Sequence, residues 1–296
     1  MEYLFAGFTA AVLGSILFGL RELLEKYLTK TKKLASLTVL ICQAFFLILF
    51  LLILGLVTKQ LNDNLTTIGI ALIGSAVLGL GLFLHLRAIS IEDFSLTLPF
   101  LSFTPIFLIP LEFIFFKALP SGAALVGIIA IIIGTLWLGY LESKEKNLKW
   151  HLSKGSRLML LVALIYSLAG NIDKMGSLSS SPLNYLFWLY LFMTLIYLAI
   201  YFQYQNKKKI TSRLSAVIKN YWPWFLLVGL IVCLASWLML NAYLTMLVNY
   251  AISIKRAGFL IPILLGPILF KEKKLAKRMP GILLMLGGAV IIILFG

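Results

Sequence analysis

Residues 34–58 read LASLTVLICQAFFLILFLLILGLVT, an apolar stretch without a single charged side chain. An α-helix needs about 20 mainly apolar residues to cross a bilayer, so this stretch predicts a membrane-spanning helix. Comparable stretches recur along the whole chain, at 4–28, 34–58, 66–88, 94–116, 121–141, 157–176, 184–205, 222–245, 248–270 and 279–296. The sequence therefore predicts an all-α polytopic membrane protein with ten transmembrane helices.

The composition favours the same class. Hydrophobic residues make up 61% of the chain and charged residues 12%, whereas a soluble domain is about half apolar and about a quarter charged. The net charge is +15, but the basic residues are concentrated in short loops, which indicates membrane topology and no nucleic-acid partner. Cys42 and Cys233 both lie inside apolar stretches. They predict neither a disulfide framework nor a metal site, and no cofactor is expected.

The basic loop residues predict the orientation of the chain. Four alternate connections hold most of them: Lys30, Lys32 and Lys33; Lys144, Lys146, Lys149, Lys154 and Arg157; Lys207, Lys208, Lys209, Arg213 and Lys219; and Lys271, Lys273, Lys274, Lys277 and Arg278. The opposite side offers only Lys59, Lys117 and Lys174. Basic loops stay in the cytoplasm, so both termini are predicted to be extracytoplasmic. The N-terminus has no basic signal-peptide region, and a bacterial or archaeal cytoplasmic membrane is the expected location.

An internal repeat relates the two halves of the chain. A constant shift of 154 residues places Phe116-Lys117 on Phe270-Lys271, Ala88 on Ala242, Gly127 on Gly281 and Gly134 on Gly288. Each half contains five predicted spans, and an odd number reverses the second half relative to the first. Inverted repeats are common in secondary transporters, whose binding site lies between the repeats near the middle of the membrane.

Several motifs resemble those of a known transporter family. They are Phe18-Gly19, answered by Ala169-Gly170; Arg87-Ala88-Ile89 with Pro99 to Pro105, Gly127 and Gly134; and Ala242-Tyr243-Leu244 with Ile261 to Leu265, Phe270 to Leu275, Gly281 and Gly287-Gly288. The chain resembles EamA-type transporters of the drug/metabolite transporter superfamily over nearly its whole length. The resemblance implies two inverted five-helix repeats, 1–142 and 157–296, joined by a cytoplasmic basic linker, 143–156. The chain departs from the family pattern at the end of helix four, where the usual acidic residue is absent. Lys117-Ala118 stands at this place, whereas the second half has Lys271-Glu272.

Lys255 and Arg256 are the main candidates for substrate binding. They lie well inside the predicted span 248–270, and charges at such depth usually face a cavity or a partner. Together they could hold a phosphate or carboxylate. The pair resembles one that contacts substrate phosphate in triose-phosphate translocators, but those proteins also have a helix-four lysine, and the matching region here reads Leu101-Ser102. The alternative is structural: Lys255 extends to the membrane interface or forms an ion pair with Asp173.

Three carboxylates inside the spans are candidates for gating or coupling: Glu22, Glu25 and Asp173. Arg21 and Glu25, like Glu22 and Lys26, are four residues apart and can pair on one helix face, so the alternative is a neutralised helix end at the membrane interface. By the predicted topology Asp173 lies near the outer end of its span and the two glutamates near the inner end. That separation argues against a shared catalytic site.

The polar lining of the pocket is expected from spans three, four, eight and nine. The candidates are Thr97, Ser102, Thr104, Trp237, Asn241, Tyr243, Tyr250 and Ser253, each of which could instead serve in interhelical hydrogen bonds. Five prolines, Pro99, Pro105, Pro110, Pro262 and Pro267, are expected to bend or loosen helices four and nine. Neither His85 nor His151 has a second metal ligand at a suitable spacing.

No nucleotide-binding or catalytic motif is present in the sequence. The sequence therefore predicts a transporter and no enzyme. The expected function is secondary transport of a small metabolite by alternating access, and the more specific form of this prediction is an anionic metabolite. The transporter is expected to act as a monomer or homodimer in the lipid bilayer. The alternatives are a membrane-embedded enzyme or flippase acting on lipid-linked substrates, and an accessory protein that only binds a partner.

Overall fold

The computed structural model describes residues 2–91, 97–145, 154–206, 213–258, 260–262, 265 and 275–295. Every regular element in these ranges is helical. The first half contains α1 (Glu2–Lys26), a π-helical turn (Tyr27–Thr31), α2 (Ser36–Thr58), α3 (Leu65–Ile91), a 3₁₀ helix (Leu98–Phe103), α5 (Thr104–Phe116) and α6 (Gly122–Glu145). The second half contains α7 (Lys154–Ser179), α8 (Pro182–Asn206), α9 (Arg213–Thr245), α10 (Val248–Ala257) and α12 (Leu275–Phe295).

Within the described residues, six helical stretches are long and apolar enough to cross a membrane. They are Phe5–Thr31, Ser36–Thr58, Leu65–Ile91, Lys154–Ser179, Pro182–Gln203 and Leu214–Thr245, and shorter apolar helical stretches occupy Phe100–Phe116, Gly122–Trp137 and Leu283–Phe295. Large apolar side chains point away from the bundle; those of Val57 and Leu294 are 75% and 66% exposed. Large exposed apolar surfaces are unusual on soluble monomers. These are the features of an all-α membrane protein.

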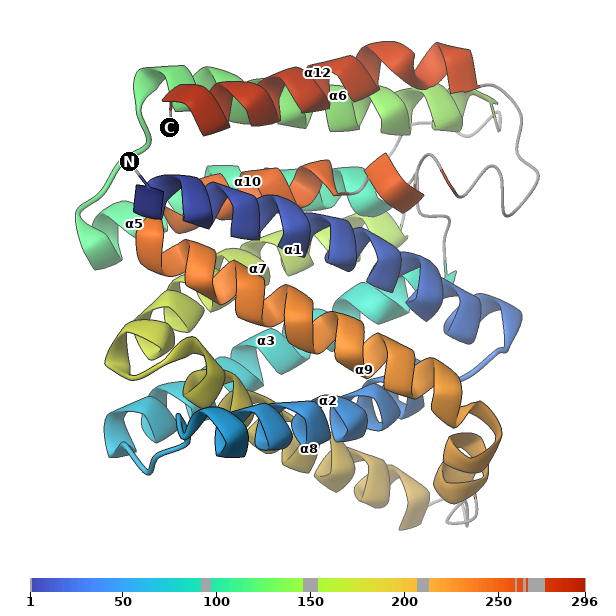
Figure 1. The fold of residues 1–296 in the computed structure, drawn as a ribbon. Coiled ribbons are helices and arrows are strands. Elements are labelled where there is room, and N and C mark those ends of the chain that lie inside the picture. Colours follow the sequence, from blue (N-terminus) through green and yellow to red (C-terminus); the bar gives the residue numbers. More distant parts are fainter. Residues whose placement is uncertain are drawn as a thin grey trace.

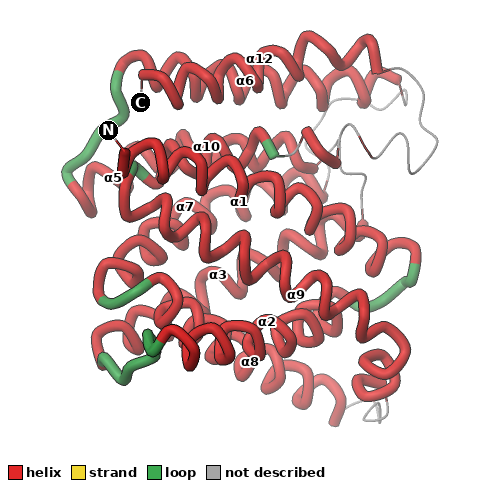
Figure 2. The backbone as a smooth tube through the Cα atoms, in the orientation of Figure 1, coloured by secondary structure: helices red, strands yellow, loops and turns green. Residues whose placement is uncertain are grey.

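The helices lie side by side, and the two termini lie at the same end of the bundle (Figure 1). The tube view in Figure 2 shows the connections gathered at the two ends of the helices. Helix α6 packs on α12 at one edge, and α2 packs on α8 at the opposite edge. Between these pairs, α1 packs on α9 and α3 packs on α7.

The contacts of the two halves correspond to each other. By their order in each half, α1, α2, α3 and α5 correspond to α7, α8, α9 and α10. The contact between α2 and α9 corresponds to that between α8 and α3, and the contact between α1 and α10 corresponds to that between α7 and α5. In the α6–α12 pair, a Cβ atom on Gly127 would lie 2.6 Å from the carbonyl oxygen of Gly288, and a Cβ atom on Gly134 would lie 2.6 Å from that of Gly281. Close packing of these two helices therefore requires glycine at these positions.

Some helices extend beyond the predicted apolar spans because hydropathy detects only the apolar part of a helix. Helix α9 begins at Arg213, well before the predicted start at 222, so Arg213 and Lys219 belong to a helix and not to a loop. The predicted linker 143–156 is helical at both ends, since α6 continues to Glu145 and α7 begins at Lys154. The remainder of the linker, the connection 207–212 and residues 266–274 lie outside the described residues.

Candidate functional site

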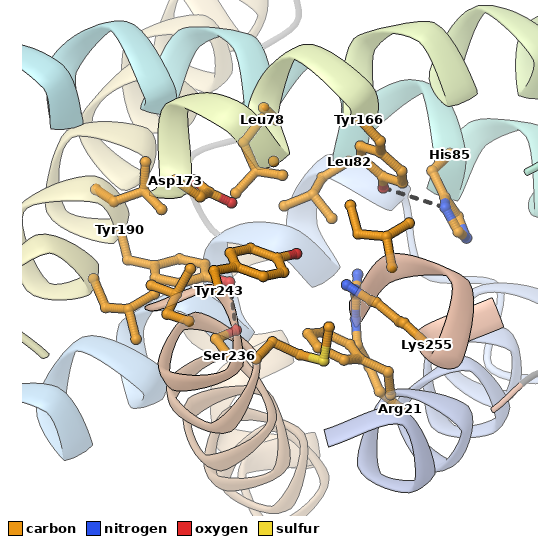
Figure 3. A pocket seen from close by; sticks show the side chains of 18 of the residues that line it. Arg21, Leu78, Leu82, His85, Tyr166, Asp173, Tyr190, Ser236, Tyr243 and Lys255 are labelled. Carbon is orange, nitrogen blue, oxygen red and sulfur yellow. Dashed lines mark hydrogen bonds between the residues drawn. The ribbon is translucent and has the colours of Figure 1, made fainter. Parts of the chain in front are cut away.

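A polar pocket lies inside the bundle, between α1, α3, α7, α8, α9 and α10 (Figure 3). The volume that the centre of a water molecule can reach inside it is about 80 Å³. Leucines of α3, α8 and α9 form much of its apolar wall. Its polar residues are Arg21, Glu22, His85, Tyr166, Asp173, Tyr190, Ser236, Tyr243, Lys255 and Arg256. Both halves of the chain contribute to this lining.

One end of the pocket holds a network of charged side chains from three helices. The Arg21 Nε group donates a hydrogen bond of 2.6 Å to Glu25 Oε1, which confirms the predicted pair within α1. The neighbouring Glu22 reaches across to α3, where its Oε2 atom lies 3.0 Å from His85 Nε2. The Nδ1 atom of His85 lies 3.2 Å from the Tyr166 hydroxyl on α7. Burial of charge requires such partners, so the network ties α1, α3 and α7 together.

Lys255 and Arg256 both face the pocket but are held differently. The Lys255 ammonium lies 3.4 Å from the centre of the Phe18 ring, a cation–π contact. Among the described residues, nothing forms a hydrogen bond or an ion pair with it. The Arg256 Nη2 group donates to Thr104 Oγ1 at 2.9 Å, and its guanidinium lies 6.0 Å from the centre of the Tyr166 ring.

The residue that anchors Arg256 stands directly before a proline in the first half of the chain, and its backbone N–H group bonds to the Leu101 carbonyl. Pro105 has no N–H group, so it cannot bond to the Leu101 carbonyl one turn earlier. The Thr104 hydroxyl donates to that carbonyl at 2.6 Å and accepts the Arg256 bond with the same oxygen. Proline was expected to alter helix four, and the segment directly before Thr104 is a 3₁₀ helix instead of an α-helix.

Asp173 lies elsewhere in the pocket and is bound by an aromatic neighbour. The Tyr185 hydroxyl of α8 donates to Asp173 Oδ1 at 2.8 Å. The predicted ion pair between Asp173 and Lys255 does not form in the described part of the chain, although both side chains line the pocket. The Tyr190 and Ser236 hydroxyls lie 3.3 Å apart beside them. Asp173 therefore has one carboxylate oxygen that is not bound by Tyr185.

Comparisons with known proteins bear on the fold alone. No protein-family model matches the sequence, and no curated protein matches it. A solved crystal structure of a protein superposes with a TM-score of 0.70 over 98% of this chain and 96% of its own, with 13% sequence identity. At this identity the likeness concerns the arrangement of the helices and carries no information about a substrate.

The candidate residues on α9 and α10 divide according to helix face. Tyr243, Lys255 and Arg256 line the pocket, and Tyr250, Ser253, Asn241 and Trp237 do not. On α9 the pocket face is formed by positions 236, 239, 240 and 243, which follow the helical period, so 237 and 241 point elsewhere. Trp237 is 41% exposed, and Asn241 bonds to its carbonyl oxygen. Tyr250 accepts a bond from the Ser121 N–H group, and Ser253 bonds to Asn249.

The remaining candidates also divide between pocket and packing positions. Thr97 and Ser102 are fully buried but outside the pocket lining, so the polar contribution expected from helix four is limited to Thr104 as the partner of Arg256. Glu22 and Asp173 line the pocket. Glu25 is buried behind it as the partner of Arg21.

His85 and Tyr166 were not predicted as site residues. Their position follows from helical spacing: 78, 82 and 85 share one face of α3, while 166, 169, 170 and 173 share one face of α7. The sequence gives no sign of which face is inward, because α3 is apolar around most of its circumference. On a helix that is apolar almost all around, two polar residues spaced one or two turns apart lie on the same face. This spacing is the sequence signal that could have identified both residues.

Two observations bear on the expectations about carboxylates. Glu22 and Asp173 line the same pocket, so their predicted separation does not argue against a shared site. The set of buried carboxylates also lacked Glu112 of α5, which is fully buried. Its Oε1 and Oε2 atoms accept bonds of 2.6 Å and 3.3 Å from the N–H groups of Val248 and Asn249. Glu112 therefore caps the start of α10, whose first N–H groups have no partner within the helix.

Proposed function

We propose that this protein is a secondary transporter that moves a small metabolite with an anionic group across the cytoplasmic membrane by alternating access. The observation that carries the proposal is the polar pocket inside an apolar helical bundle, lined by helices of both halves. Polar and charged side chains inside a membrane protein are expensive and usually mark a substrate or ion path. Two five-helix halves that rock against each other would open this pocket to each side in turn.

The contacts between halves support two inverted repeats, and ten spans, as in the drug/metabolite transporter superfamily. Under the 154-residue shift Gly127 corresponds to Gly281 and Gly134 to Gly288. If each residue is replaced by its counterpart in the other half, the Gly127–Gly288 contact becomes the Gly281–Gly134 contact. Both contacts are present. A pseudo-two-fold axis between α6 and α12 accounts for this reciprocity. The two termini at one end of the bundle fit an even number of crossings (Figure 1).

The state of Lys255 supports an anionic substrate. Arg21 is paired with Glu25, and Arg256 is anchored to Thr104. Lys255 presents three N–H donors on its ammonium, and its contact in the described structure is the Phe18 ring. A carboxylate or phosphate entering the pocket would give this ammonium an ionic partner, with the apolar wall left for the rest of the metabolite.

A specific observation keeps the alternative of lipid-linked substrates open. Because Glu22 and Asp173 share one pocket, a membrane-embedded enzyme or flippase would find acid and base groups together with a cationic site for a phosphate head group. A product in a mixture of the protein with phosphorylated polyprenols would favour the enzyme. Movement of such a lipid between leaflets without chemical change would favour the flippase.

The test is a thermal-unfolding screen of the purified protein against inorganic phosphate, benzoate, benzenesulfonate, simple amines and neutral sugars. A ligand that binds the folded state raises the unfolding temperature by mass action. We expect stabilisation by anions, its loss in Lys255→Met, and its retention in Lys219→Met, which removes an exposed lysine on α9. Stabilisation by amines or sugars alone, unchanged in Lys255→Met, would contradict an anion site at Lys255.

Binding has to be followed by a transport measurement. The anion that stabilises the protein is supplied in radiolabelled form to proteoliposomes, and uptake is compared between wild type, Lys255→Met and Lys219→Met. Saturable uptake in wild type that is lost only in Lys255→Met supports transport through this pocket. Binding without any uptake in either direction would refute the transporter proposal and leave a binding protein.

A further inference from the structure

Another cavity lies beside the first turns of α1, at the end of the bundle that holds the two termini (Figure 1). The volume that the centre of a water molecule can reach inside it is about 340 Å³. This cavity, termed the vestibule, is lined by Phe8, Lys174, Leu244, Thr245, Met246, Leu247 and Tyr250. On α1, Phe8 of the vestibule precedes Phe18 of the polar pocket by about 15 Å along the helix axis.

A thin wall separates the vestibule from the polar pocket. On α7, Asp173 lines the pocket and the next residue, Lys174, lines the vestibule. On α9, Tyr243 and Leu244 divide between the two cavities in the same way. The wall therefore includes the end of α7, the end of α9 and the corner that joins α9 to α10.

The α9–α10 corner has the backbone of a hinge. Met246 and Leu247 belong to neither helix, and Leu247 is extended, with φ −64° and ψ 140°. A short break of this kind can absorb a change in backbone angles while the helices on both sides keep their shape. Since α9 carries Tyr243 and other residues of the pocket wall, a tilt of α9 at this hinge would move that wall.

The two sides of the hinge are held by different helices. Glu112 of α5 caps the start of α10, and a Cβ atom on Gly170 of α7 would lie 3.0 Å from Ile252 Cδ1 on α10. The end of α9 packs on α1 instead, where a Cβ atom on Gly7 would overlap Thr245 Oγ1. The start of α10 is therefore packed with α5 and α7, whereas the end of α9 is packed with α1.

A hydrogen bond of Lys174 joins these two groups of helices at the vestibule. Its Nζ group on α7 donates to the carbonyl oxygen of Met246, directly after α9, at 3.0 Å. This bond requires only an N–H donor, which a lysine side chain has with or without its extra proton. Met246 lines the vestibule, so its carbonyl oxygen could bond to water once Lys174 has moved away. Breaking the bond would therefore leave no buried acceptor without a partner.

The corresponding pair of helices is tied at the charged end of the pocket. By their order in each half, α1 and α3 correspond to α7 and α9, and Glu22 of α1 bonds to His85 of α3 at 3.0 Å. In transporters with inverted repeats, access alternates between the two ends of one central site. The Lys174–Met246 and Glu22–His85 bonds occupy related places in this plan, although their residues do not correspond under the 154-residue shift.

We propose that the Lys174–Met246 bond is a gate between the vestibule and the polar pocket. It is closed in this structure, and it opens when Lys174 releases Met246 and the end of α9 tilts away from α7 at the hinge. Access to the pocket from the end that holds the termini then depends on this bond. The proposal rests on the transporter function, but it is independent of the charge of the substrate.

The test measures how fast a pocket cysteine reacts with a membrane-impermeant methanethiosulfonate reagent. The cysteine is introduced by Ala169→Cys, at a buried position that lines the pocket, in a chain that also carries Cys42→Ala and Cys233→Ala. Right-side-out and inside-out membrane vesicles expose opposite ends of the bundle. Lys59→Cys in a parallel sample shows which vesicles expose the end with the termini, because the α2–α3 connection, which begins with the exposed Lys59, lies at that end (Figure 1).

Lys174→Met removes the donor and keeps a side chain of similar length. In the vesicles that expose the end with the termini, we expect the pocket cysteine to react about three- to tenfold faster than with Lys174 intact, which is the shift that loss of one hydrogen bond from the closed state produces. Lys174→Arg keeps N–H donors and should retain the slow rate. Lys117→Met, which makes the same change at an exposed lysine, should retain it too. Lys174→Gln, whose amide reaches less far, takes the place of Lys174→Met if that variant does not fold.

Equal rates with and without the Lys174 side chain would overturn the gate. An equal gain in both kinds of vesicle would overturn it as well, because it would mean a general loosening of the fold. Fast reaction from the end with the termini while Lys174 is intact would show that the pocket is already open there, which also contradicts the proposal. None of these rates requires a substrate, so the gate can fail while uptake into proteoliposomes is found, and uptake can be absent while the gate behaves as expected.

Discussion

Replacement of Glu112 by alanine tests how α10 is held in the bundle. The carboxylate of Glu112 crosses from α5 to the first turn of α10, where it accepts bonds of 2.6 Å from the Val248 N–H group and 3.3 Å from the Asn249 N–H group. Glu112, Val248 and Asn249 are all fully buried. Lys255 and Arg256 lie on the same short helix, so a loose start of α10 would also disturb the pocket.

The size of the effect follows from the two donors left without an acceptor. A buried N–H group that loses its partner destabilises the fold by about 1–3 kcal/mol. The 3.3 Å bond belongs at the low end, so Glu112→Ala should lower the free energy of unfolding by about 2–4 kcal/mol. Glu112→Gln keeps one acceptor oxygen but turns an amide N–H group towards the other donor, and its loss should be about 1–3 kcal/mol.

The free energy of unfolding is measured by SDS titration of the protein in mixed micelles, and hydrogen–deuterium exchange of residues 248–257 reports on α10 itself. Phe113→Ala is the control, since this neighbour of Glu112 is 47% exposed on the outer surface. We expect faster exchange of α10 in Glu112→Ala and unchanged exchange in Phe113→Ala. If Glu112→Ala unfolds within about 0.5 kcal/mol of wild type and its α10 amides exchange at the wild-type rate, the capping argument is refuted.

Two further predictions concern packing. Gly134→Val should destabilise the α6–α12 pair by about 1–3 kcal/mol, because its Cβ would lie 2.6 Å from a backbone oxygen, whereas Gly287→Val on the open side of α12 should be neutral in the same SDS titration. Cys42 and Cys233 are 0% and 1% exposed, so a thiol-reactive maleimide should label neither in the folded protein and both after unfolding. Rapid labelling of either thiol without loss of helical circular dichroism would contradict its buried position.

The sequence was informative wherever a property belongs to a single helix. The apolar stretches coincide with helices wherever the structure describes them, and the Arg21–Glu25 pair is set by spacing within α1. Helix ends were placed less well: α9 extends to Arg213 because backbone hydrogen bonds continue into a polar turn that hydropathy does not register. The depth of Lys255 and Arg256 pointed to the pocket because a buried charge is unfavourable wherever it occurs.

The partners of the charged residues could not be predicted in this way. Glu22 bonds to His85 on α3 and not to a neighbour on its own helix, and Glu112 bonds to the start of α10. Each of these bonds joins residues far apart in the chain, and no local spacing signals it. Trp237 and Asn241 were predicted to line the pocket but do not, because they lie on the face of α9 that turns away from it. Which face of α9 is inward is likewise set by its packing against other helices.

The sequence alone therefore determined an α-helical membrane protein, because a bilayer demands long apolar helices whatever their neighbours are. Tertiary structure decided which face of each helix is inward, because a helix that is apolar on all sides carries no mark of its inner face. It also brought Glu22, His85, Tyr166 and Lys255 from four helices into one pocket. Their proximity depends on how the helices pack, and helix packing depends on contacts between distant parts of the chain.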